Sequence, residues 1–453
     1  MEIKEYLKEN FPEMKKALAR LVKIPSVSGK KEGEYPFGAE CGRVLDEFLM
    51  LCEENGFNGK NYDYYAGSTD FSESGEPALG ILAHLDVVPA AQKDWNFPAF
   101  DVTEKDGKLY GRGCMDDKGA VIASLFAMKA VRECGYTLKR NVRLIVGCSE
   151  ETGSELDIKE YMKRAKMPDA VFTPDAAYPV ICTEKGTVKF EFGGSFNCSD
   201  IETLCGGTVV NAVPAEVKAV LNGKKDDYIL PEAEGIEFSL ENGKTVILCK
   251  GKSAHAASPE HGVNAFTKLF KYLLNVNISE NDKKMLSSVL GLFPVGETNA
   301  ESLGLNVTDE SGNTTCVFSI LDYKDGKLSC KADMRFPVSL TKAEATKKIG
   351  EAVKKNGLKL ISAVGSESHC ADKNSDFVRT LLKVYTDVTG KEGCCKSIGG
   401  GTYVHGIDGG VAFGMEIEGE DNNIHGADEW IGCDNMITSA EIFAEVIIEY
   451  CGK

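Results

Sequence analysis

Two of the six histidines have carboxylates nearby in positions that suit a metal site. His84 and Asp86 lie two residues apart in AHLDVVP, within the apolar run PALGILAHLDVV, which predicts a buried strand over residues 77–88. Side chains two apart on a strand leave the same face, so a histidine ligand and an orienting carboxylate would lie together. A buried histidine satisfied by a structural aspartate fits the pattern equally well, and the pair alone leaves both interpretations open.

Further carboxylates follow at the ends of other predicted elements. Asp116 and Asp117 stand in GRGCMDDKG at the start of a predicted helix, where a single aspartate would suffice as an N-cap. Glu150 and Glu151 follow NVRLIVGCS, a buried strand pattern, although acidic pairs are usually solvated loops. The set is completed by Asp175 in TPDAAYP and His425 in NIHGADEW. Together these side chains offer the nitrogen and oxygen ligands of a two-metal hydrolytic site.

The elements that would position these residues alternate between strand and helix. Strand patterns and a helix over residues 116–134 predict an α/β domain whose mixed sheet is sandwiched by helices. After about residue 184 the pattern changes to alternating strands separated by polar turns, and strand–helix alternation returns with a helix over 375–390. We therefore predict a domain of residues 185–370 inserted into an α/β domain formed by residues 1–184 and 371–453.

Composition narrows the class of protein. The chain has 453 residues, of which 43% are hydrophobic and 27% charged, and its formal net charge of −17 argues against nucleic-acid or membrane-surface partners. The 16 cysteines are scattered without a Cys-x-x-Cys motif, and no secretory signal or stretch long enough to span a bilayer is found. These features predict a cytoplasmic protein. A thiol enzyme is a weaker alternative, because no cysteine has a partnering histidine in a recognisable motif.

The order of the motifs resembles a known family. H-x-D, GRG-x-x-DDKG, SEE, PD and a histidine near the C-terminus are together similar to the metallopeptidase family M20, and within it to bacterial dipeptidases of the dipeptidase V, or carnosinase-like, branch. The resemblance implies two divalent cations per chain, with zinc expected and manganese or cobalt as alternatives. It implies that His84 and Asp175 bind one cation and that Glu151 and His425 bind the other. It further implies that Asp116 bridges the two cations. In the same family pattern Asp86 orients His84 and Glu150 is the general base. It also implies a cis peptide bond after Asp116.

The inserted domain carries matching motifs. By resemblance it is an enlarged, ferredoxin-like α+β lid, in which His255 of GKSAHAASPEHGVNA would stabilise the oxyanion. Asn211 and Arg335 match positions that hold the substrate backbone and its C-terminal carboxylate, although the residues alone suggest a turn amide and a surface charge. Thr402 in GGGTYVHG matches a substrate loop, where Val404 and the histidine after it depart from the arginine that relatives often carry.

The resemblance implies the hydrolysis of dipeptides with a free N-terminus, including the β-Ala-His or Xaa-His type. The inserted segment is longer than one ferredoxin-like module needs. In the dipeptidase branch that the chain resembles, an enlarged lid lets one chain supply the lid histidine to its own site, so the resemblance implies a monomer. Within the same family, an N-acyl or N-succinyl amino acid deacylase is the alternative. A catalytically inactive metal-binding relative is an alternative from a different class.

Overall fold

The computed structural model describes residues 1–452 and divides into two compact units. The first unit comprises residues 1–182, 370–396 and 401–453, and the second comprises residues 183–369 and 397–400. The chain thus leaves the first unit and returns to it, and the short segment Ser397–Gly400 is grouped with the second unit.

The first unit is built on a mixed sheet. Its strand order is β1-β2-β6-β3-β7-β22-β9-β20, and β21 pairs with β9. The strands are β1 (Gly59–Tyr62), β2 (Ala66–Asp70), β3 (Pro77–His84), β6 (Asn141–Gly147), β7 (Ala170–Thr173), β9 (Val180–Glu184), β20 (His369–Cys370), β21 (Cys395–Ile398) and β22 (Val411–Ala412). β3 runs parallel to β6 and β7, whereas β2 is antiparallel to β6. The predicted α/β fold with a mixed sheet is therefore confirmed.

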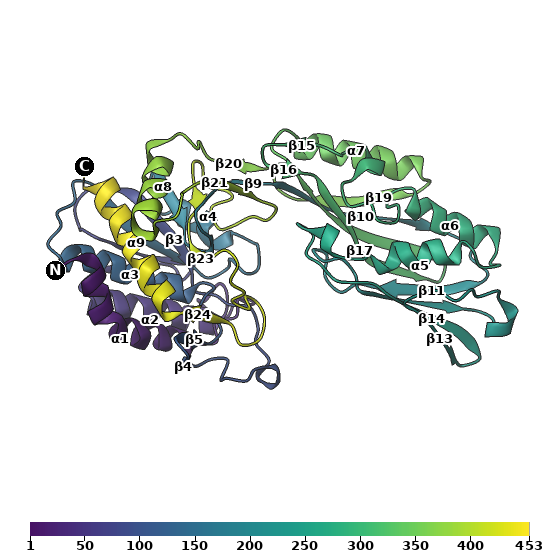
Figure 1. Ribbon diagram of the computed structural model, residues 1–453, viewed down its shortest axis with the longest axis horizontal. Helices are drawn as coiled ribbons and strands as arrows, with labels where there is room; N and C mark the ends of the chain where they lie inside the picture. The colour runs from purple at the N-terminus through teal and green to yellow at the C-terminus, as the bar shows by residue number, and fades with distance from the viewer. Residues whose placement is uncertain (453) are drawn as a thin grey trace. The chain divides into compact units, whose positions relative to one another are not determined.

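Helices and loops cover both faces of this sheet. The helices are α1 (Ile3–Val22), α2 (Ala39–Glu54), α3 (Lys118–Glu133), α4 (Leu156–Met162), α8 (Asp376–Thr389) and α9 (Cys433–Cys451). α3 and α9 lie side by side (Figure 1). Alternate residues of the strands point to opposite faces: Ile81 and Leu144 belong to the core formed with α1, α3 and α9, while Leu82 and Ile145 join a smaller core with α4.

Two small sheets lie in the loops of the first unit. One joins β4 (Thr103–Lys105), β5 (Lys108–Tyr110) and β24 (Trp430–Gly432), and the other joins β8 (Ala176–Ala177) to β23 (Met415–Glu416). Each connects a segment that precedes residue 178 with one that follows residue 414, so the two ends of the chain are held together in one unit.

The second unit is an eight-stranded antiparallel sheet with three α-helices (Figure 1). The strands, in sheet order, are β13 (Ile236–Glu241), β14 (Lys244–Lys250), β12 (Glu216–Leu221), β11 (Ile201–Gly206), β17 (Thr315–Lys324), β18 (Lys327–Phe336), β10 (Gly186–Ser195) and β19 (Lys359–Val364). Phe190 and Phe192 of β10 pack in a core with residues of α5 (Ala265–Leu273), α6 (Glu280–Leu290) and α7 (Lys342–Lys355). The α+β class predicted for the inserted segment is confirmed.

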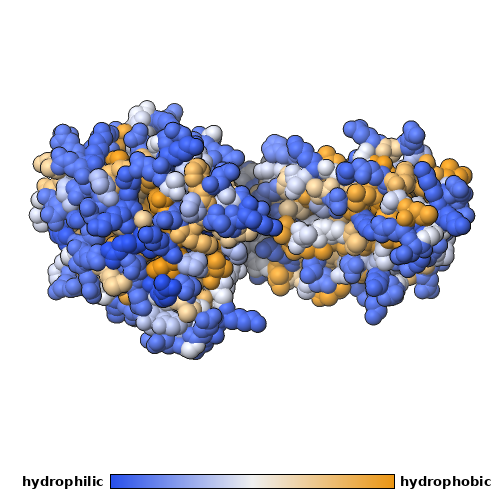
Figure 2. Space-filling view, turned by 90° about the horizontal axis from the view of Figure 1, so that it is seen from below, coloured by the Kyte–Doolittle hydropathy of each residue, from blue (hydrophilic) through white to orange (hydrophobic). Residues whose placement is uncertain are grey.

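The surfaces of the two units differ in hydropathy. Hydrophilic side chains cover most of the face of the first unit seen in Figure 2, and hydrophobic side chains are more frequent on the second unit. Among residues 1–452, no helix has both the length and the apolar character that crossing a membrane would require.

Candidate metal centre

Three parallel strands bring the candidate ligands to one edge of the first unit's sheet. β3 ends at His84, β6 is followed by the turn that carries Glu150 and Glu151, and β7 is followed by Asp175. β3 lies between β6 and β7 and is parallel to both, so their carboxyl ends meet. Open α/β sheets present their sites at this edge.

Asp116 lies between two histidines. Nε2 of His84 is 3.0 Å from Oδ1 of Asp116, and Nε2 of His425 is 2.9 Å from its Oδ2. His84 also lies 3.6 Å from Oδ2 of Asp175, and His425 lies 3.1 Å from Oε2 of Glu151. Each oxygen of one carboxylate thus faces a different imidazole, an arrangement suited to a carboxylate shared by two cations.

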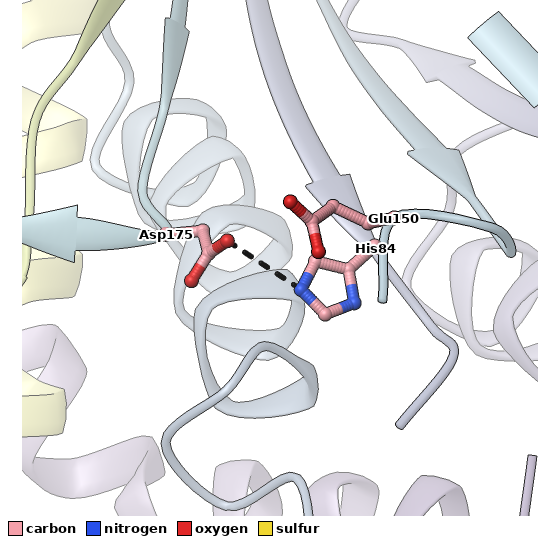
Figure 3. Close-up of side chains that lie close together, drawn as sticks. All are labelled: His84, Glu150 and Asp175. Atoms are coloured by element: carbon pink, nitrogen blue, oxygen red, sulfur yellow. Dashed lines mark ion pairs between the residues drawn. The ribbon is translucent and has the colours of Figure 1, made fainter. Parts of the chain in front are cut away.

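The side chains form two groups that could each hold a cation. One comprises His84, Glu150 and Asp175, and the other comprises Asp116, Glu151 and His425; the ligand atoms of each lie within 4.8 Å of one another. Figure 3 shows the first group, in which Glu150 and Asp175 approach the imidazole of His84 from different segments of the chain.

The donor set fits cations. Nε2 of His84 and Oε1 of Glu151 are buried, and neither makes a well-aligned hydrogen bond, although Nε2 lies 3.0 Å from Oδ1 of Asp116. Burial, together with the charges of Asp175 and Asp116, raises the pKa of Glu150 to about 8, and burial also raises the pKa of Asp175. Crowded, partly buried carboxylates are costly without a compensating positive charge, and two divalent ions would supply it.

Asp86 supports this centre differently from the sequence prediction. β3 ends at His84, so Asp86 lies beyond the strand and the expected same-face strand pair is wrong. Nδ1 of His84 lies 3.0 Å from the backbone carbonyl of Asp86 and 3.6 Å from its carboxylate. The carboxylate also accepts the backbone N–H groups of Glu150 and Glu151, at 3.2 and 3.1 Å, and so holds the turn that presents both glutamates.

Asp117 also departs from the helix-cap expectation. α3 begins at Lys118, and the Asp117 side chain makes no cap hydrogen bond. Its Oδ2 accepts the backbone N–H of His84 at 3.0 Å, which ties the end of β3 to the loop that carries Asp116. The peptide bond between Asp116 and Asp117 is cis, as the resemblance implies.

An ion pair that sequence reasoning missed links the two loops of the second ligand group. Glu429 is fully buried, and its carboxylate accepts the backbone N–H groups of Gly113, Met115 and Asp116 at 2.9 to 3.1 Å. It also pairs with the guanidinium of Arg112, which donates to the carbonyl of Gly426, the residue after His425. This buried pair fixes Asp116 and His425 relative to each other.

Glu429→Gln is therefore expected to destabilise the fold by about 3–5 kcal/mol, because it leaves the buried Arg112 charge without its partner. Urea unfolding with and without added metal would measure this loss. Glu418→Gln, which breaks the exposed pair with Lys396, should leave the stability close to that of wild type. Equal stabilities of the two variants would contradict the role assigned to the buried pair.

A second set of hydrogen bonds that the sequence did not predict supports the segment just before Glu150 and Glu151. The carboxylate of Asp157 accepts the backbone N–H groups of Cys148 and Ser149 at 2.9 and 2.7 Å, and also the hydroxyl of Tyr403. The Tyr403 ring meets His84 edge-on, with centroids 6.1 Å apart. Tyr403 thus anchors the segment that also carries Thr402 beside the candidate metal centre.

Val404, the departure from the family pattern, is buried in the core next to α4. Its position therefore has a packing role in this chain. The missed residues Arg112, Glu429 and Tyr403 stand in GRG, ADEW and GGGTYVHG. Each lies in a motif that also contains a predicted site residue.

Three predicted substrate residues lie in the second unit. Asn211 and His255 are on neighbouring segments, because the Asn211 carbonyl accepts the N–H of Ala256 at 2.9 Å. Nδ1 of His255 accepts the N–H of Ala257 at 3.2 Å, which leaves the proton of a neutral ring on Nε2. Partial burial and the charge of Arg335 lower the pKa of His255 and favour that neutral form.

Arg335 is buried, so the surface-charge interpretation of this residue is wrong. Its Nε and Nη2 donate to the carboxylate of Asp333 at 2.5 and 2.9 Å, and its Nη1 donates to the Gly399 carbonyl at 3.1 Å. Because a guanidinium has five N–H donors, one on each Nη is left over.

Comparisons with known proteins agree with the motifs and the fold. Residues 80–449 match the model of peptidase family M20/M25/M40. The chain is 31% identical to a putative dipeptidase, YtjP, of Bacillus subtilis over 91% of each chain, and 31% identical to the Beta-Ala-Xaa dipeptidase of Lactobacillus delbrueckii subsp. lactis over 96% of this chain and 95% of that one.

Among solved structures, human carnosine dipeptidase 1 matches with a TM-score of 0.60 at 16% identity, over 99% of this chain and 98% of the other, which shows a common fold. The sequence match spans most of the chain and includes His84, Asp116, Glu151, Asp175 and His425. The protein is therefore a member of peptidase family M20/M25/M40.

Proposed function

We propose that the protein is a dipeptidase that depends on two divalent cations, with zinc expected at both positions. The observation that carries this proposal is the position of Asp116, whose two oxygens face His84 and His425 separately. The names of the two relatives at 31% identity, a putative dipeptidase and a Beta-Ala-Xaa dipeptidase, support the substrate class.

In this proposal His84 and Asp175 would hold one cation, Glu151 and His425 would hold the other, and Asp116 would contribute to both. Glu150 could also reach the first cation, because it belongs to the same group as His84 and Asp175. We assign it instead as the general base, since Asp116 already supplies an oxygen on the His84 side. Asp86 then acts as a positioning residue for both glutamates.

When bound, the two cations would polarise the peptide carbonyl and lower the pKa of water in the site. Glu150 takes a proton from that water and delivers it to the leaving amine. The pKa of Glu150, about 8 in the cation-free protein, would fall when positive charge is added nearby, so that the carboxylate is ready to accept a proton at neutral pH.

The second unit would supply substrate contacts as a lid. His255, with its proton on Nε2, is suited to donate to an oxyanion. The two remaining N–H groups of Arg335 are suited to the two oxygens of a C-terminal carboxylate, with Asn211 and Thr402 as further polar contacts. A closed lid of limited size would exclude longer peptides.

We further propose that the protein is a cytoplasmic monomer. Its 16 cysteines are all free thiols, in keeping with a reducing compartment. A molar mass of one chain in solution would support the monomer, and a dimer whose His255 serves the partner's site would contradict it.

The function is tested with metal-reconstituted protein and a substrate panel. The panel contains β-Ala-His, Ala-Ala, a tripeptide, an N-acetyl amino acid and an N-succinyl amino acid. We expect cleavage of the free-amine dipeptides alone, its loss on chelation and its return with added Zn²⁺, Mn²⁺ or Co²⁺. Cleavage confined to the acylated compounds would identify a deacylase. No cleavage by the metal-loaded protein would point to an inactive relative.

A further inference from the structure

Glu416 is a carboxylate beside the metal centre that has no role in the proposed mechanism. It lies in β23, which runs parallel to β8 so that Met415 is opposite Ala176 and Glu416 is opposite Ala177. Asp175, a proposed ligand, immediately precedes β8. The pairing therefore places Glu416 beside Ala177, two residues along the chain from Asp175.

Glu416 and its directly paired residue Ala177 share one face of this strand pair, and the alternating burial of residues 175–177 extends that face to Asp175, which precedes β8. Residues alternate between faces along a strand, and directly paired residues share a face. Met415 and Ala176 are buried, whereas Glu416, Ala177 and Asp175 are partly exposed, which fits that alternation. The backbone is held on both sides of the pair: the Tyr178 N–H donates to the Glu416 carbonyl at 3.0 Å, and the side-chain amide of Asn435 donates to the Met415 carbonyl at 3.0 Å.

The charge environment agrees with this placement. Burial and the negative charges of Asp175 and Asp116 raise the pKa of Glu416 to about 7, while His425 opposes the shift. Within residues 1–452, no side chain forms a hydrogen bond or ion pair with the Glu416 carboxylate. By contrast, Glu418, two residues further along, pairs with Lys396 at 2.8 Å. A partly buried carboxylate without a partner costs free energy that a cationic ligand would recover.

Glu416 is not part of either ligand group of the metal centre. The other cation that a dipeptidase must handle is its substrate's ammonium group. In a dipeptide whose scissile carbonyl lies at the centre, the α-amino group is only one carbon away from that carbonyl. A carboxylate on the same face as Asp175 is suited to meet it.

We propose that the Glu416 carboxylate binds the free amino group of the dipeptide and thereby selects unacylated substrates. This inference rests on the proposed dipeptidase function. An N-acyl amino acid has no ammonium group at this position, so its acyl group would cover Glu416 without offering a charged partner. Discrimination then comes from the unpaired carboxylate as much as from the favourable contact with the ammonium group.

The test is a comparison of Glu416→Gln with wild type and with the matched variant Glu418→Gln. The substrates are Ala-Ala and propionyl-alanine, which is Ala-Ala without its amino group; β-Ala-His and propionyl-histidine replace them if β-Ala-His is cleaved faster. For each protein one measures kcat and KM on the dipeptide, the kcat/KM or inhibition constant of the des-amino compound, and the number of metal ions bound.

We expect Glu416→Gln to lose about 10- to 100-fold in kcat/KM on the dipeptide, mainly through KM, because the ammonium contact is present in both ground and transition states. The kcat/KM or inhibition constant of the des-amino compound should change less than about threefold, and two metal ions should remain bound. Glu418→Gln should have the kinetics of wild type. A merely structural role would weaken both compounds equally and would overturn the inference.

Two further outcomes also overturn it. Loss of a metal ion from Glu416→Gln would make this residue a ligand, and dipeptide kinetics equal to wild type would leave it without a role in binding. Both outcomes leave the dipeptidase proposal intact. If wild-type protein with two ions bound cleaves no dipeptide of the panel, the proposed function itself fails, and this inference fails with it.

Discussion

Glu150→Gln is expected to lower kcat on dipeptides by about 1000-fold while the protein still binds two metal ions. An amide of the same shape cannot accept a proton from water, and general base catalysis contributes about 10²- to 10⁴-fold. The turn that carries residue 150 is held through its backbone by Asp86, so the substitution leaves the position of Glu151 intact. Steady-state kinetics and metal analysis on the same preparation would check both parts of the expectation.

Glu155→Gln is the matched control, since the Glu155 side chain is 38% exposed and its one ion pair within residues 1–452 is with Lys159 of α4. It should retain wild-type kcat and both ions. Glu150→Ala should also keep the ions but lose nearly all turnover. Loss of one ion from the glutamine variant would instead make Glu150 a ligand, which its grouping with His84 and Asp175 allows chemically.

Asp116→Asn is expected to weaken both metal positions at once, by about 100-fold or more in affinity, and to reduce turnover by a comparable or larger factor. The amide replaces one anionic oxygen with an N–H₂ group, which cannot serve as a ligand, and it removes the charge shared between His84 and His425. Even residues that only support ligands typically change metal affinity 10- to 100-fold. Titration with Zn²⁺ monitored by calorimetry would resolve the two positions.

The contrast with Asp175→Asn tests the sharing directly. Asp175 lies 3.6 Å from His84, whereas the ion pairs of His425 within residues 1–452 are with Asp116 and Glu151, so the Asp175 variant should lose affinity at one position and keep the other. If Asp116→Asn also leaves one position unchanged, Asp116 is not a bridge and the two groups are independent sites.

The candidate ligands were predictable because they stand in short motifs at the ends of strands. Period-two and short apolar patterns place β3, β6 and β7, and parallel strands deliver their following residues to one edge. The family resemblance added the roles. The helix pattern over residues 375–390 likewise predicts α8, because Ser375 caps it and Gly390 follows it.

The positioning residues were harder to predict because their partners are distant in the chain. Glu429 binds backbone groups of residues 113–116, and Tyr403 binds Asp157, so neither contact leaves a local pattern. The role proposed for Glu416 likewise depends on the pairing of β23 with β8, which joins segments far apart in the chain. A residue type at a given spacing cannot show which backbone N–H groups will need an acceptor once the loops have packed.

The sequence by itself determined the donor types, their order and the α/β class, since these depend on local periodicity and on motifs. The tertiary structure alone decided that the two oxygens of Asp116 face different histidines, that Asp86 serves the glutamate turn, and that Arg335 is buried against Asp333. Those features depend on side-chain direction across strands and loops far apart in the chain. That direction is set by packing and by the need to satisfy buried polar groups.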